Sequence, residues 1–79
     1  MDAREATRLV KEYFEETNGP LGTVFFQVQS VEPDEEEDGS WVVRCSFFPG
    51  PHAQTRDYFC VRIRPDKTFA RVERVGSDL

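Results

Sequence analysis

Apolar side chains recur at intervals of three and four residues along the first part of the chain, which is the spacing of one helix face. Charged side chains fill most of the positions between them. Asp2 and Glu5 are spaced as in a capping box, and Gly19 followed by Pro20 is a typical helix end. The pattern therefore predicts a helix near residues 3–18 whose buried face is formed by Ala3, Ala6, Leu9, Val10, Tyr13, Phe14 and Thr17.

From residue 23 the hydrophobic period changes to two, which is typical of strands. Four such segments follow, near residues 24–29, 41–48, 56–64 and 68–75, and turn-forming residues separate them. The fourth segment alternates less regularly than the others. Ala70 and Val72 suggest one inward face, Phe69 and Val75 suggest the other, and a β-bulge would reconcile them.

Short links between successive strands favour an antiparallel meander. The chain is therefore predicted to be one small α+β domain over residues 1–79, with two layers: the N-terminal helix packed on one face of a four-stranded antiparallel meander sheet. Residues 32–39 are expected to form a mobile acidic loop, and residues 76–79 a flexible tail. The helix is expected to cover the face formed by Val24, Phe26, Val28, Trp41, Val43, Cys45, Phe47, Phe59, Val61 and Ile63.

This order of one helix and four strands resembles that of small families such as the PepSY domains and the gas-vesicle accessory proteins, and more loosely the cystatin-like fold. The resemblance covers most of the chain, as an order of elements. It implies a helix packed on a meander, and it brings no function with it, because no family motif matches residue by residue.

One helix covers one face of a sheet, so the opposite face is expected to be open. Aromatic and arginine side chains share this open face, a composition that is enriched at protein interfaces, and arginine also stacks on aromatic rings. We therefore predict a non-enzymatic binding or accessory module that contacts a protein partner or a second copy through this face. The alternative is an ordinary surface whose aromatic rings are covered by arginine stems. The predicted binding residues are Phe25, Gln27, Arg44, Phe48, Tyr58, Cys60, Arg62 and Arg64, with Gln29 beside them.

Charge is divided unevenly along the chain. Residues 1–40 hold eleven Asp and Glu against three Lys and Arg, whereas residues 41–79 hold seven Lys and Arg against four acids. We expect the acidic side chains on the outer face of the helix and in the loop, and much of the basic charge on the open face. Arginine and aromatic residues on an open sheet also suit single-stranded nucleic acid, but the net charge of −5 disfavours that partner.

A catalytic site is the second alternative, and its candidate is the loop around His52, with Arg56 and Asp57. These side chains could supply a general base and an anion clamp to a small enzyme or ligand binder, but no nucleophile motif accompanies them. Cys45 and Cys60 are predicted to lie on opposite faces of the sheet, which argues against a disulfide.

We expect neither a metal site nor a cofactor, because the chain has one histidine and no CxxC motif. No apolar run approaches the roughly 20 residues that span a bilayer, and no secretory signal is visible. The expected location is therefore the cytoplasm, with no membrane partner.

Overall fold

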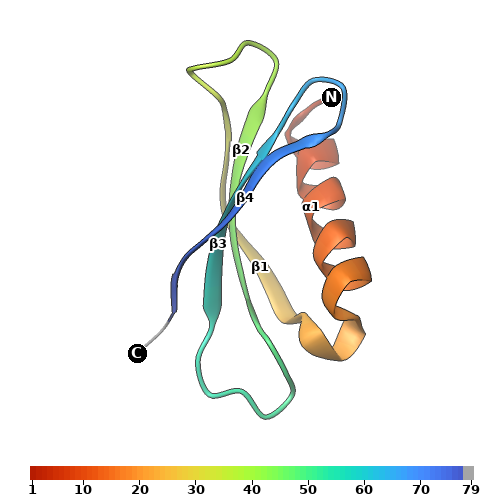
Figure 1. Cartoon of the computed structure of the whole chain (residues 1–79), viewed down its shortest axis with the longest axis vertical. Helices are drawn as coiled ribbons and strands as arrows, with labels where there is room; N and C mark the ends of the chain where they lie inside the picture. The colour runs from red at the N-terminus through yellow and green to blue at the C-terminus, as the bar shows by residue number, and fades with distance from the viewer. Residues whose placement is uncertain (78–79) are drawn as a thin grey trace.

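A computed structural model describes residues 1–77 of the chain (Figure 1). The elements are α1 (Ala3–Asn18), a short 3-10 turn η1 (Pro20–Gly22), β1 (Val24–Pro33), β2 (Trp41–Phe48), β3 (Asp57–Ile63) and β4 (Phe69–Ser77). The strands form one antiparallel sheet in the order β1-β2-β3-β4, and α1 lies along one of its faces (Figure 1). The predicted helix-plus-meander fold is confirmed.

The ends of α1 follow the predicted capping residues. The side chain of Asp2 accepts a hydrogen bond from the backbone N–H of Glu5 at 2.8 Å, which satisfies one of the free donors of the first turn. Gly19 ends the helix with a φ of 78°, and its N–H donates to the carbonyl of Glu15 at 2.8 Å. A left-handed backbone at this position favours glycine, so the helix ends where the sequence predicted.

The core lies between α1 and the covered face of the sheet. Phe14 is at its centre, and its ring centroid is 5.0 Å from that of Phe47 and 4.9 Å from that of Phe59. The rings of Phe47 and Phe59 are stacked, with centroids 5.3 Å apart. The buried apolar residues are Ala6, Val10, Phe14, Val43, Cys45, Phe47, Val61 and Ile63. Aromatic rings bury a large area per residue, which compensates for the small size of the domain.

Two irregularities in β1 change the predicted alternation. The register slips by one residue between Val24 and Gln27, and again between Val28 and Ser30. Val24 pairs with Phe48 and so lies on the open face, and its predicted place under the helix is wrong. The second slip brings Val31 to the helix side, where it packs against the buried core, as Phe26 and Val28 do. A bulge inserts one extra residue, so it reverses the faces of all residues beyond it.

Two bulges in β4 have the same effect. Arg62 pairs with Arg71 and Ile63 with Phe69, which leaves Ala70 as the extra residue, exposed and not inward-facing as predicted. Phe69 instead packs against the core, with its ring centroid 4.8 Å from that of Tyr13. The bulge that the irregular alternation suggested is present, but it places Phe69 and Val72 on the helix side.

The predicted acidic loop, residues 32–39, is called the acidic segment below. It begins inside the sheet, because β1 extends through Glu32 and Pro33. Asp34 is buried, and its N–H donates to the carbonyl of Ser40 at 2.9 Å. Gly39 has a φ of 82°, and a Cβ built there would lie 2.9 Å from Pro65 Cγ, so this loop lies against the β3–β4 turn. Of the predicted tail, Gly76 and Ser77 are the last residues of β4, and residues 78–79 lie outside the described residues.

Candidate functional site

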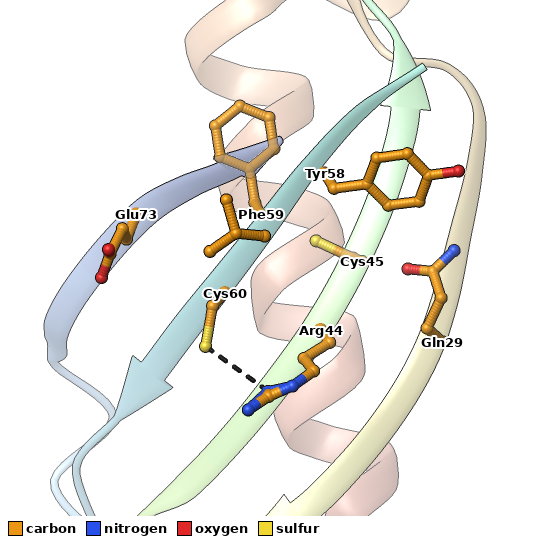
Figure 2. Close-up of a pocket in the computed structure, with 8 residues that line it drawn as sticks. Gln29, Arg44, Cys45, Tyr58, Phe59, Cys60 and Glu73 are labelled. Carbon is orange, nitrogen blue, oxygen red and sulfur yellow. Dashed lines mark hydrogen bonds between the residues drawn. The ribbon is translucent and has the colours of Figure 1, made fainter. Parts of the chain in front are cut away.

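The open face is the side of the sheet opposite α1, and we use this name for it throughout. Strand register assigns to it Arg44, Ser46 and Phe48 of β2 and their cross-strand partners on β1, β3 and β4. At its centre is a hollow of about 380 Å³ to which all four strands contribute (Figure 2). The hollow is lined by Gln29, Arg44, Cys45, Tyr58, Phe59, Cys60, Glu73 and Val75.

Arg44 lies beside this hollow without a carboxylate partner. Its Nη1 approaches Cys60 Sγ at 3.8 Å, and Figure 2 shows its guanidinium directed towards this sulfur. Within residues 1–77, Arg44 forms no ion pair, because no carboxylate oxygen lies within 4.0 Å of its guanidinium nitrogens. A thiol is a weak acceptor, so several strong donors of Arg44 remain available next to an apolar hollow.

Beneath the side chains of the open face is a buried hydroxyl. Ser46 is 0% exposed, and its Oγ accepts hydrogen bonds from Gln29 Nε2 at 2.7 Å and from Arg56 Nη1 at 3.2 Å. These bonds tie β1 to the segment that precedes β3 and hold Gln29 and Arg56 in place. The open face is thus partly pre-organised by its own hydrogen bonds, which lowers the entropy cost of binding.

The end of the open face next to the β2–β3 loop is aromatic, and we call Phe25, Phe48 and Arg56 the aromatic end. The Phe25 and Phe48 rings meet edge to face with centroids 6.3 Å apart, and the Arg56 guanidinium carbon lies 4.6 Å from the Phe48 centroid. Phe25 is 75% exposed. Its backbone has a φ of 54°, a left-handed conformation that disfavours large side chains. Arg56 Nη1 donates to the Phe25 carbonyl at 2.7 Å and so holds this conformation.

The opposite end of the open face is occupied by the acidic segment. Arg62 Nη1 lies 3.0 Å from Glu36 Oε2 and 3.4 Å from Asp34 Oδ2. The hydrogen bond that Arg62 donates to Glu36 and the negative charge of Asp34 raise the pKa of Arg62 above its usual value. The expected separation of charge is therefore wrong in part, because two acidic side chains lie on the open face and pair with Arg62 of the same chain.

The structure separates the residues of the predicted His52 site. His52 is exposed in the β2–β3 loop, and none of the described hydrogen bonds involves it. Arg56 belongs to the aromatic end, whereas the Asp57 carboxylate pairs with Arg74 at 2.9 Å. Consecutive residues of an extended segment point to opposite faces, so these three side chains do not converge on one substrate.

The other predicted surface residues are not equivalent. Gln27 is exposed on β1 and pairs with Ser46, so it belongs to the open face. Arg64 lies in the β3–β4 turn, outside β3, and its Nη1 approaches Thr68 Oγ1 at 3.5 Å. We therefore leave Arg64 out of the candidate surface.

The two cysteines are free and in different environments. Cys45 is buried in the core, and this burial raises the pKa of its thiol to about 12. Cys60 is half-buried on the open face. No group of three or more His, Cys, Asp or Glu side chains in residues 1–77 is arranged to hold a metal ion. No helix in this part of the chain is long and apolar enough to cross a membrane.

Sequence reasoning missed four contributors to this surface. Ser46 alternates with the predicted Arg44 and Phe48 and so shares their face, but its hydrogen bonds come from side chains of two other segments. Glu73 and Val75 line the hollow as well: Glu73 alternates with the inward Val72, and Val75 is the extra residue of a bulge. Arg56 was assigned to a loop site, although its spacing from Tyr58 by two residues would have indicated the same face.

Comparison with known proteins adds no relative: no protein-family model, curated protein or solved structure matches this chain.

Proposed function

We propose that this chain is a non-enzymatic binding module and that its open face is the docking surface for a protein partner or a second copy. The observation that carries the proposal is the pairing of an apolar hollow with Arg44, a cation that has no carboxylate partner within residues 1–77. Interfaces combine a desolvated apolar centre with arginine and aromatic anchors in this way. The contact residues are Phe25, Gln27, Gln29, Arg44, Phe48, Arg56, Tyr58 and Cys60.

The charges around the hollow indicate what the partner presents. Arg44 and Arg56 stand on the open face without a carboxylate partner in the described part of the chain, whereas Arg62 is already neutralised by Asp34 and Glu36. An apolar side chain in the hollow, next to an aspartate or glutamate that reaches Arg44, would complement this pattern. We therefore expect an acidic segment of a protein as the ligand.

The thiols support the proposed cytoplasmic location. Cys45 and Cys60 lie on opposite faces of adjacent strands, so the fold keeps both unpaired within one chain. Free thiols persist in a reducing compartment.

Two charge reversals of the same kind test the proposal. Arg44→Glu changes the open face, and Lys11→Glu makes the same change on the exposed outer side of α1. The tagged chain and both variants are used to capture partners from cells that express the chain naturally. The molar mass of each purified protein is measured by light scattering after size-exclusion chromatography. We expect wild type and Lys11→Glu to retain the same partner or the same self-association, and Arg44→Glu to lose it.

Two results would overturn the proposal. The first is a strict monomer whose captured proteins are the same for wild type, Arg44→Glu and Phe25→Glu. The second is binding of a labelled single-stranded oligonucleotide that Arg44→Glu abolishes and that falls steeply with salt, since this would assign the face to nucleic acid.

A further inference from the structure

The outer edge of β4 is a second surface with unused binding capacity, separate from the open face. Within residues 1–77, β4 is the last strand of the sheet and pairs only with β3. All residues from Ala70 to Gly76 are exposed, and Figure 1 shows the end of β4 leading away from α1. The outer edge of such a strand carries backbone N–H and C=O groups that another strand can pair with.

The two edges of the sheet differ in how well they can accept a strand. At the β1 edge, the backbone at Phe25 is left-handed, two register slips follow, and the strand ends at Pro33. In β4 the bulges lie at Ala70 and Val75, on either side of an uninterrupted stretch, residues 71–74. β1 has a regular stretch of the same length, residues 30–33, but it ends in Pro33, which has no backbone N–H to donate. The β4 stretch contains no proline and is therefore the better edge for a further strand.

We propose that two copies of this chain pair antiparallel through their β4 edges, with Val72 of one copy opposite Val72 of the other. A two-fold axis perpendicular to the sheet relates two antiparallel strands and keeps both copies of α1 on one side. Residues opposite each other must then share a face. Within the regular stretch, this condition favours a pairing centred on Arg71, Val72, Glu73 or Arg74.

Charge distinguishes between these four registers. A pairing centred on Arg71 or on Arg74 places two arginines opposite each other, and one centred on Glu73 places two glutamates opposite each other, which is unfavourable in all three cases. A pairing centred on Val72 places each Arg71 opposite Glu73 of the second copy, on the open face. Arg71 Nη2 and Glu73 Oε2 are already 2.9 Å apart within one chain, so the dimer would join two such pairs into a cluster of four alternating charges.

The apolar residues of β4 fit the same arrangement. Val72 lies on the helix side, opposite the buried Val61, yet it is 36% exposed. Pairing would cover each Val72 with its copy. The result is one continuous sheet with both helices on one side and both hollows on the other. Each hollow lies close to the β4–β4 junction, because Glu73 and Val75 of β4 line it. Such a dimer presents two equal binding surfaces in the same direction and gains affinity for a partner with two sites.

Charge exchange across the two-fold axis tests this register. The variants are Glu73→Arg, which places like charges opposite each other, and the double variant Arg71→Glu/Glu73→Arg, which restores opposite charges. Glu12→Arg, the same reversal on the exposed side of α1, is the matched control. Sedimentation equilibrium measures the dimer dissociation constant, and circular dichroism verifies the fold of each variant. We expect Glu73→Arg to raise the constant at least about tenfold, and the double variant and Glu12→Arg to stay within about threefold of wild type.

Several outcomes would overturn the proposal. A wild-type chain that stays monomeric up to about 1 mM has no useful β4 contact. A dimer that Glu73→Arg leaves unchanged, or that the double variant fails to restore, does not use this register. The proposal is independent of the function proposed above, and Arg44→Glu separates the two: loss of dimer in Arg44→Glu but not in Glu73→Arg would assign self-association to the open face.

Discussion

Replacing Phe25 with glycine separates the two roles that this exposed ring can have, support of the fold and contact with a partner. The left-handed backbone at Phe25, with a φ of 54°, costs a residue with a side chain about 1–2 kcal/mol. Glycine avoids this cost but loses about 0.5–1 kcal/mol through its more flexible unfolded chain. The ring itself contributes little, because three quarters of it is exposed: about 0.5–1 kcal/mol from burial and a similar amount from its edge contact with Phe48.

These contributions nearly cancel, so the free energy of unfolding of Phe25→Gly should lie within about 1 kcal/mol of wild type. The neighbouring Phe26 is the matched control. Its ring packs in the core, with centroids 6.5 Å from Phe14 and 6.4 Å from Phe47, and Phe26→Ala should cost about 2–4 kcal/mol.

Urea unfolding followed by the fluorescence of Trp41, the single tryptophan, measures both changes on one scale. A loss of more than about 2 kcal/mol in Phe25→Gly would refute the reasoning, because the ring would then support the fold. The same variant should lose the partner that wild type captures. Unchanged stability together with unchanged capture would leave the strained ring without the contact role that we assign to it.

Three further predictions concern the open face and the core. Arg62→Ala should lower the free energy of unfolding more than Arg64→Ala does, because it leaves the buried carboxylate of Asp34 (4% exposed side chain) without its cation. Arg64→Ala should cost less than about 0.5 kcal/mol in the same urea experiment, and equal costs would contradict the assignment of these two arginines. Cys60 should react with an aromatic disulfide reagent in the folded protein, whereas Cys45 should react only on unfolding. Burial raises the pKa of the Cys45 thiol to about 12 in the folded protein, whereas the thiol of the unfolded chain has a pKa of about 9. The unfolded chain therefore loses this proton first, and the free energy of unfolding falls as the pH rises from about 9 towards 12. Cys45→Ala should flatten this alkaline fall, and an identical fall in the variant would refute the cause.

The regular parts of the fold were predictable because local patterns and tertiary packing agree there. The spacing of Ala6, Val10 and Phe14 defines the buried helix face, and their complete or near-complete burial follows from it. The strands β2 and β3 keep a strict period of two and pair without a slip, so Arg44, Tyr58 and Cys60 were assigned to the open face from alternation alone.

The edge strands were predicted less well, because bulges are set by tertiary packing and leave only weak local signals. One extra residue near Phe25 moved Val24 to the open face, and one at Ala70 moved Phe69 to the core. The irregular pattern of β4 did indicate a bulge, but not which residue it would displace. In β1 the run Val24-Phe25-Phe26 is apolar throughout, so periodicity gives no warning of a slip.

Long-range electrostatics lie beyond what alternation can predict. The acidic segment was expected to be a separate loop, yet Asp34 and Glu36 reach Arg62, which follows them by more than 25 residues in the sequence. A charge pattern limits which partners are compatible, but the fold decides which charges are already paired within the chain. The candidate surface therefore became smaller at the acidic end, and Arg44 and Arg56 remained as its cations without a carboxylate partner among residues 1–77.

The central claim is that partners dock on the open face and not on the helix side. Site-specific photo-crosslinking in cells that express the chain naturally tests it most directly, with a benzophenone amino acid in place of Phe25 or, as the control, of Lys11 on the exposed side of α1. The account predicts one discrete adduct, with a protein partner or a second copy, from position 25 only, and its loss when Arg44→Glu is added to the same chain. The absence of an adduct at position 25, or the same adduct from both positions, would contradict it.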